Sequence, residues 1–306
     1  MSAWAHATAP TPTPSHCSFE QALITPALMV GTFACPGVPP RTEVEAAPFP
    51  EIVVARKGAY VREDAAGAVY IDRTVAAFFE AERPYVIVHP RPRPDVTTVV
   101  SLKDPDAVCA ALDVRVGDGR CFARSAVRAS PALHLCHREL VRALRERERE
   151  QHALSAEEAA VRLVSCAVAL NHDVTAELSA PPTARTAAEV DVAFAIAEYL
   201  NAHFDENVRL DALATYSGYS VFHLCRLFHA RMRTSIHKYL TLVRLEHALE
   251  ALADTDRAIA AIALEHGFAS QAHFTSAFKR WTGTSPAAAR ASARPPVRRT
   301  RARKPR

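Results

Sequence analysis

The sequence predicts an α+β protein with two domains, the first rich in β-strands and the second wholly helical. Three observations support this prediction. Short apolar runs separated by turn residues fill 19–120, a pattern typical of a small sandwich or barrel. Helical periodicity begins near residue 121 and dominates from 189 onward. The region 189–290 also contains an internal repeat.

The N-terminal part divides by composition. Residues 1–18 are rich in Pro, Thr and Ala and are predicted to lack fixed structure. Residues 121–180 are predicted to form a helical extension, and 181–188, rich in Pro, Thr and Ala, a linker. The six predicted strands are Leu28–Cys35, Glu51–Tyr60, Ala68–Asp72, Val75–Phe79, Tyr85–His89 and Val96–Leu102.

Residue types that could bind a metal are scattered. The seven cysteines are an odd number without a CxxC pair, which favours reduced thiols in a cytoplasm over a disulfide framework or a zinc knuckle. Cys136 lies close to His134 and His137, but no second ligand pair has the spacing to complete a tetrahedron. In the strand region His89 stands alone. We therefore expect no metal site, no cofactor and no catalytic residue.

Charge alone does not decide whether the protein binds nucleic acid, whereas hydropathy argues against a membrane. The net charge is +4, and residues 290–306 carry eight Lys and Arg and no acid. The tail 291–306, predicted to be disordered, is equally well explained as a solvated end and as an arm that binds phosphate. The apolar stretches are too short to cross a membrane and the N-terminus lacks a signal peptide, so we expect no membrane partner and a cytoplasmic protein.

The repeat in 189–290 has the form of two helix-turn-helix units. Leu213–Ala214, followed by Gly218, recurs 49 residues later as Ile262–Ala263, followed by Gly267. In each unit a short helix ends at a glycine, which adopts the positive φ of a tight turn. Ser220 and Ser270 then stand where a side chain would cap the second helix. The predicted short helices are Leu210–Ser217 and Ile259–Glu265.

The second helix of each unit has one apolar face and one face left for a partner. Leu224 and Phe228, like Phe274 and Phe278, are spaced to pack onto the preceding helix. Arg can donate to guanine, Gln can pair with adenine, and Phe, Ala or the Thr methyl can touch a thymine methyl. The free faces, which we predict to bind DNA, consist of Phe222, Cys225, Arg226 and His229 in the first unit and Gln271, Ala272, Thr275, Ser276 and Lys279 in the second.

A long helix, about Ile236–Ala253, is predicted between the two units. At about 1.5 Å per residue it would be about 27 Å long. One turn of DNA is about 34 Å, so a single chain would contact two successive major-groove segments.

The residues that carry the pattern resemble a known family. The stretch TDRAIAAIALEHGFASQAHFTSAFKRWTGTSP, which ends at Pro286, is similar to the most diagnostic run of the AraC/XylS family of bacterial transcription regulators. The resemblance covers 189–290 and implies sequence-specific binding to double-stranded promoter DNA, with RNA polymerase as a partner of an activator. Ala258 stands where this family often has a capping Ser or Thr, and Asp256 is an alternative cap.

The N-terminal resemblance is to the cupin-like sensor domain of some members, carried by PFPEIVVARKGAYVREDAAGAVYIDRTVAAFFEAERPYVIVHP. It implies a barrel that binds a small-molecule effector or supports a homodimer, and the sequence does not separate these roles. Two alternatives stay open: a cupin-type metal enzyme and a nonspecific architectural DNA binder that carry the same C-terminal domain.

Overall fold

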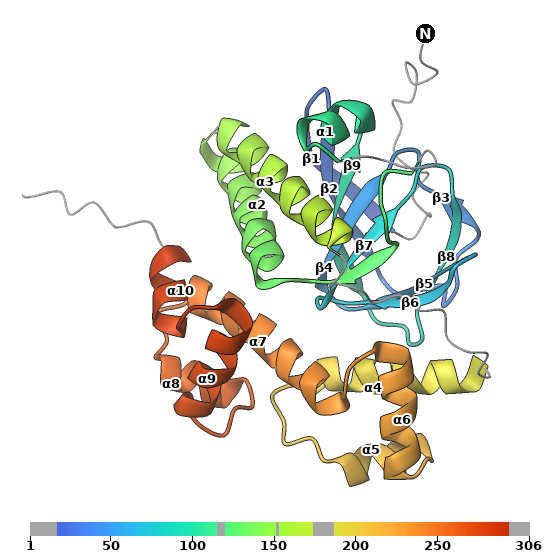
Figure 1. The fold of residues 1–306 in the computed structure, drawn as a ribbon, viewed down its shortest axis with the longest axis vertical. Coiled ribbons are helices and arrows are strands. Elements are labelled where there is room, and N and C mark those ends of the chain that lie inside the picture. The colour runs from blue at the N-terminus through green and yellow to red at the C-terminus, as the bar shows by residue number, and fades with distance from the viewer. Residues whose placement is uncertain (1–16, 115–119, 151–152, 174–186, 294–306) are drawn as a thin grey trace, which may run out of the picture. The chain divides into compact units, whose positions relative to one another are not determined.

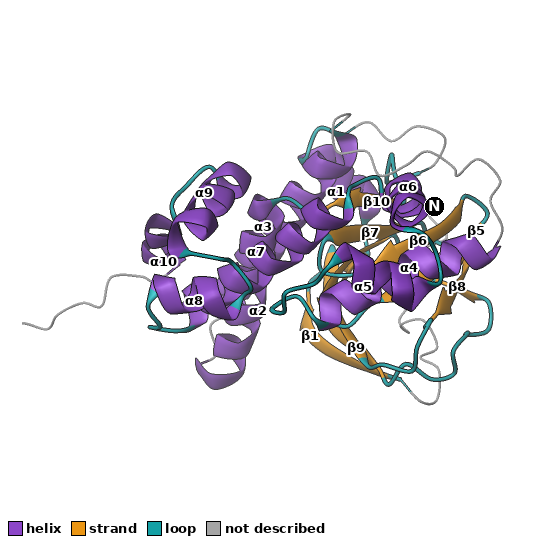
Figure 2. Ribbon diagram, turned by 90° about the horizontal axis from the view of Figure 1, so that it is seen from below, coloured by secondary structure: helices purple, strands orange, loops and turns teal. Residues whose placement is uncertain are grey.

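The computed structural model describes residues 17–114, 120–150, 153–173 and 187–293 (Figure 1). The chain forms two compact units. The first contains the chain up to Tyr199 together with Leu210–Ile236, and the second contains Leu200–Arg209 and the chain from His237 onward. Within the described residues all strands lie in the first unit, and the second consists of helices and loops (Figure 2).

Two antiparallel sheets form the β-rich part of the first unit. The larger has the strand order β1-β2-β9-β4-β7-β10 and the smaller β3-β8-β5-β6. The larger sheet consists of β1 (Ser18–Ile24), β2 (Leu28–Cys35), β4 (Glu51–Lys57), β7 (Val75–Phe79), β9 (Asp95–Leu102) and β10 (Ala126–Arg128). The smaller sheet consists of β3 (Glu45–Ala46), β5 (Tyr60–Asp64), β6 (Gly67–Ile71) and β8 (Pro84–Val88).

The larger sheet is buried on both faces, which explains why its strands are almost continuously apolar. Side chains alternate between the faces, so Ile52 and Val100 pack in one cluster and Val53 and Val99 in another. The second cluster fills the space between the two sheets, since it also holds Tyr60 from the smaller sheet.

Three helices accompany the sheets. α1 (Pro105–Ala111) follows β9 and is capped by Asp104, whose side chain accepts a hydrogen bond from the N–H of Ala107 at 3.0 Å. α2 (Pro131–Glu150) and α3 (Ala153–His172) pack on the outer face of the larger sheet through Leu133, Leu140 and Leu163, among others (Figure 1). These helices therefore close the core on the side away from the smaller sheet.

Most predicted elements are present, and the differences are local. The α+β class is confirmed, but the sheets are open and not a closed barrel. The strand predicted over Glu51–Tyr60 is broken at Gly58, whose φ of +72° ends β4 before β5 begins in the other sheet. β10 lies in the stretch predicted to be helical, and it pairs with β7. The segments predicted as a disordered N-terminus (1–18), a linker (181–188) and a disordered tail (291–306) lie mostly outside the described residues. At their edges the structure differs from the prediction, since Ser18 begins β1, a helix begins at Ala187 and the last helix ends at Ala293.

The helical region described from Ala187 onward contains seven helices, among them the two helix-turn-helix motifs α5–α6 and α8–α9. In the first compact unit, α5 (Leu210–Ser217) and α6 (Val221–Met232) follow α4 (Ala187–Ala202). The second compact unit holds α7 (Ile236–Asp254), apart from its first residue, followed by α8 (Ile259–Glu265), α9 (Gln271–Thr282) and α10 (Pro286–Ala293). No helix among the described residues has the length and hydropathy required to span a membrane.

Candidate nucleic-acid interface and sensor cavity

The first helix-turn-helix presents a free helix face on α6. Leu224, Leu227 and Phe228 are buried, so they fix the opposite face toward solvent. Phe222 is 81% exposed, and Arg226 and His229 are also exposed, whereas Cys225 is half-buried. An exposed ring contributes little burial to folding, so Phe222 is available for contact with a partner.

The second unit presents the corresponding face on α9. Phe274, Ala277 and Phe278 are buried in the core of this unit. The side chains on the other face lie in solvent, except for the half-buried Thr275; these exposed residues are Gln271, Ala272, Ser276 and Lys279. The nine residues predicted to bind DNA therefore lie on two solvent-facing helix faces, one in each unit.

Matching caps and turns position both helices. The side-chain oxygens of Ser220 and Ser270 accept hydrogen bonds from the N–H groups of His223 and His273, at 3.3 and 3.1 Å. Gly218 and Gly267 precede them with φ of +72° and +74°. The first helix of the second helix-turn-helix, α8, begins after Ala258, which makes no side-chain cap hydrogen bond.

The C-terminal ends differ between the two units. After each helix the chain turns through a residue in the left-handed conformation, and the N–H of that residue donates to the carbonyl four residues earlier. This residue is Arg233 after α6 and Gly283 after α9. Arg233 has a φ of 54°, a region that costs a side-chain-bearing residue free energy. The first helix-turn-helix therefore carries backbone strain at its C-terminal end that the second lacks.

Two arginines tie α6 to the β-rich part of the same compact unit. Arg231 donates from Nη2 to the carbonyl of Ala68 in β6 at 2.9 Å, and its guanidinium lies 5.0 Å from the ring centroid of Phe194. Arg128 of β10 donates from Nη2 to the carbonyl of Met232, also at 2.9 Å. These contacts involve the last turn of α6 and leave the exposed face at Phe222 and Arg226 uncovered.

A cavity of about 90 Å³ lies between the two sheets. Its wall is mostly apolar, with rings from Phe33, Tyr60, Phe79 and Tyr85. Glu51 also lines it; burial raises the pKa of this carboxyl to about 7, although a hydrogen bond donated by Ser101 at 2.9 Å opposes the shift. Such a mostly apolar pocket with a few polar groups suits a small ligand.

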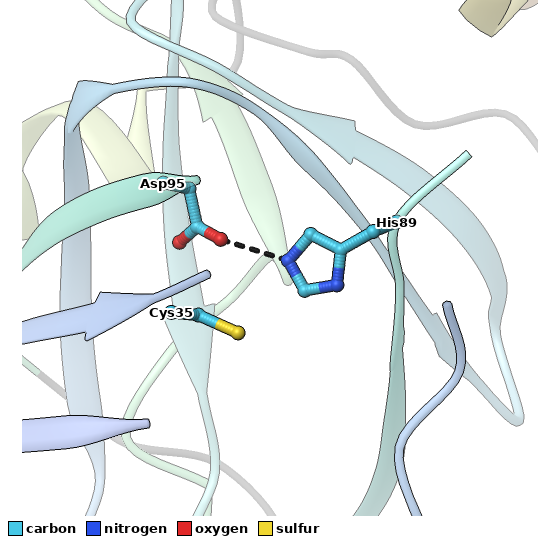
Figure 3. Close-up of side chains that lie close together, drawn as sticks. All are labelled: Cys35, His89 and Asp95. Carbon is cyan, nitrogen blue, oxygen red and sulfur yellow. Dashed lines mark hydrogen bonds and ion pairs between the residues drawn. The ribbon is translucent and has the colours of Figure 1, made fainter. Parts of the chain in front are cut away.

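One end of the cavity gathers polar and sulfur-bearing side chains. His89 Nε2 lies 2.7 Å from Asp95 Oδ2, and the thiol of Cys35 points toward the same imidazole (Figure 3). The sulfur of Cys17 is 3.0 Å from the sulfur of Cys35. His89 stands alone in its strand region in sequence, as a buried residue directly after β8, but in space Asp95 and Cys35 lie beside it.

The charges at this end of the cavity depend on one another. Burial opposes ionisation of the Cys35 thiol, but His89 and Cys17 outweigh it and lower the pKa of Cys35. Burial likewise opposes protonation of His89, but the hydrogen bond with Asp95 prevails and raises the pKa of His89 to about 9. The sequence signal for this cluster was weak: only His89 and Asp95 are near each other, on either side of the Pro-rich turn 90–94.

The fold and its two exposed helix faces define a tandem helix-turn-helix protein. A family model described as a helix-turn-helix domain matches residues 213–292. The protein named "Probable transcription factor PqrA" from Proteus vulgaris is 40% identical over 83 residues, which are 27% of this chain and 68% of that relative. The chain belongs to the AraC/XylS family of bacterial transcription regulators.

A second relative matches a similar length of this chain. An HTH-type transcriptional regulator of Staphylococcus aureus strain COL is 37% identical over 91 residues, which are 30% of this chain and 12% of that protein. The chain therefore matches about an eighth of the length of such relatives. A solved AraC-type regulator from Chromobacterium violaceum is 30% identical, with a TM-score of 0.32, over 36% of this chain and 95% of its own.

Proposed function

We propose that the protein is a sequence-specific DNA-binding regulator of transcription in which α6 and α9 each enter a major groove. The observation that carries the proposal is the solvent-facing side of α6, where Phe222 is 81% exposed beside Arg226 while the opposite side is buried. Aromatic and guanidinium groups on an exposed helix face suit contact with base edges. The family of the C-terminal region supports the same function.

The length of α7 sets the expected operator. Its 19 residues correspond to about 28 Å of helix, against about 34 Å for one turn of DNA. The operator should therefore consist of two short base-specific segments about one helical turn apart, on one face of the duplex. Such a regulator works in the cytoplasm, where the bacterial chromosome lies.

The β-rich part would control this binding. The cavity between its sheets suits a small-molecule effector, because it is enclosed by apolar rings and carries a few polar groups. A homodimer and a contact with RNA polymerase, in the case of activation, complete the proposed set of partners. A metal enzyme would need an open coordination position beside a substrate, and a purely architectural binder would show no preferred sequence.

Selection of binding sites from random duplexes, followed by fluorescence anisotropy on the selected operator, tests the proposal. Arg226→Ala should lower affinity for the operator by about 1–3 kcal/mol if the side chain contacts a guanine, and should relax the preference at one base position. Arg142→Ala is the matched control, since it removes the same charge from an exposed side chain of α2 that pairs with Glu146 at 3.7 Å.

Salt dependence separates specific from nonspecific binding. Affinity for random DNA should fall steeply with salt because it arises from phosphate contacts, whereas the operator should keep an advantage at every concentration. Removing residues 291–306 should weaken binding to both duplexes alike. If selection yields no preferred sequence, or if Arg226→Ala behaves like the Arg142 control, α6 does not contact bases.

A further inference from the structure

Four side chains with metal-binding atoms meet at one end of the cavity. The donor atoms of Cys35, His89 and Asp95 all lie within 4.8 Å of one another, and the sulfur of Cys17 is 3.0 Å from that of Cys35. All four side chains line the cavity. Thiolate, imidazole and carboxylate are the ligands that zinc takes in proteins.

The register of the larger sheet explains why three of these residues are neighbours. Cys35, the last residue of β2, pairs directly with Asp95, the first residue of β9. On its other side β2 pairs with β1, and the Ser18–Ala34 pair places Cys17 opposite Cys35 one step further along. Directly paired residues point to the same face of a sheet, so these side chains project together into the cavity.

The fourth residue comes from the other sheet. His89 directly follows β8, and its ring is directed toward Asp95 and Cys35 (Figure 3). Its Nε2 atom is bonded to Asp95, while Nδ1 is buried with no hydrogen-bond partner among the described residues. Nε2 is the ring nitrogen that faces both Asp95 and Cys35, so it is the atom that would bind an ion, in place of its bond to Asp95 (Figure 3).

We propose that these four side chains form a binding site for one divalent transition-metal ion of the zinc class. Two cysteines and a histidine select zinc and related ions over magnesium or calcium, which prefer oxygen ligands. Cys35, His89 and Asp95 would supply three ligands, and Cys17, whose sulfur is 3.0 Å from that of Cys35, would turn its thiolate to the ion as the fourth. Four protein ligands would complete a tetrahedron and leave no position for a substrate, the mark of a structural or sensing site and not of a catalytic one. The ion would link β1, β2 and β9 to the end of β8, and so join the two sheets beside the cavity.

Binding requires the thiols and the imidazole to lose their protons to solvent. The ion therefore replaces the hydrogen-bonded proton between the two sulfurs and the proton shared by His89 and Asp95. Metal affinity should accordingly rise with pH, and binding should release protons that are measurable by calorimetry in buffers of different ionisation enthalpy. The site is independent of DNA, so it can fail or hold irrespective of the proposed function.

The experiment is a titration of the reduced full chain with Co²⁺, whose absorption reports thiolate ligands and tetrahedral geometry, followed by competition with Zn²⁺. We expect one equivalent of Co²⁺ per chain with a sulfur-to-metal charge-transfer band, which Zn²⁺ abolishes. Cys17→Ser and Asp95→Asn should each weaken Zn²⁺ binding at least tenfold. Zn²⁺ should also raise the temperature of unfolding of the parent chain.

A second thiol pair provides the control. Cys136 and Cys166 are hydrogen-bonded to each other, but the described residues place no histidine–carboxylate pair beside them. Cys136→Ser should leave the Co²⁺ spectrum unchanged. Because Cys17 is only half-buried, its replacement by Ser should preserve the fold, which circular dichroism verifies.

Three outcomes would overturn the proposal. One is a Co²⁺ spectrum without sulfur charge transfer; the second is equal loss in Cys17→Ser and Cys136→Ser. The third is a reduced chain that takes up no ion while peroxide links Cys17 to Cys35, because the pair would then be a redox-active dithiol and not a metal site.

Discussion

Replacing Gly267 by alanine tests how the second helix-turn-helix is held together. Gly267 ends α8 with a φ of +74°, and a Cβ atom there would lie 2.8 Å from the guanidinium of Arg244. Arg244 in turn donates from Nε to the carbonyl of Phe204 at 2.6 Å and from Nη2 to that of Glu206 at 2.8 Å. The methyl group would therefore displace a side chain that anchors the loop before α5.

The expected loss in the free energy of unfolding has two parts. A left-handed conformation costs an L-residue about 1–2 kcal/mol. Displacing the half-buried Arg244 adds the loss of at least one charge-assisted hydrogen bond, about 1–2 kcal/mol at the lower end of the usual range because water replaces part of it. Gly283 lies in the same compact unit with a φ of +79° and open space around it. We expect Gly267→Ala to cost about 2–4 kcal/mol and Gly283→Ala about 1–2 kcal/mol.

The assay is urea unfolding followed by the fluorescence of Trp281, whose ring lies 6.2 Å from that of Phe278. A Trp4→Phe background removes the second tryptophan. Repeating both glycine variants with Arg244→Ala completes a double-mutant cycle. In that background Gly267→Ala should cost no more than Gly283→Ala. Equal losses in the parent background would refute the role assigned to Arg244.

Three further perturbations have defined signs. Ser270→Ala should cost about 1 kcal/mol in the same unfolding assay, because the N–H of His273 loses its cap. If the loss is absent, water replaces that bond. Arg233→Gly should stabilise the first unit by about 0.5–1 kcal/mol, since it relieves a φ of 54° but gives up a cation near a helix C-terminus; thermal unfolding measures it, and a lower midpoint would contradict it. Glu51 holds a proton in the folded state up to a pKa of about 7, against an ordinary value of 4.5. The folded chain therefore binds more protons than the unfolded one, stability falls as pH rises from about 4.5 to about 7, and Glu51→Gln should remove that slope in a pH series of denaturation curves. An unchanged slope would assign the dependence to other groups.

The helix-turn-helix region was predictable because its information is local. Ser220 and Ser270 cap helices within three residues of themselves, and Gly218 and Gly267 sit at the turns that require positive φ. The sheets were less predictable, since closure depends on pairing between distant strands. The three-residue β10 has too short a pattern to be separated from the helix that follows it.

The cluster at the end of the cavity could not be found by spacing. Cys35 and Asp95 are 60 residues apart in sequence and become direct neighbours only through the register of β2 and β9. Cys17 joins the cluster because it directly precedes β1, a strand that the sequence did not predict and that pairs with the other side of β2. Metal-ligand spacing in sequence is diagnostic only when one loop or hairpin supplies the ligands.

The strand β9 links the cavity to the helices behind the sheet. Thr97 and Val99 line the cavity, whereas Thr98 between them forms a 2.8 Å hydrogen bond with Nε2 of His137 on α2. Burial lowers the pKa of His137 to about 3, so the ring is neutral at pH 7 and this bond does not depend on its protonation. Any ligand that shifts β9 must therefore move α2 or break the bond between Thr98 and His137. Because the sheet is packed tightly on both faces, it transmits such a shift and does not absorb it.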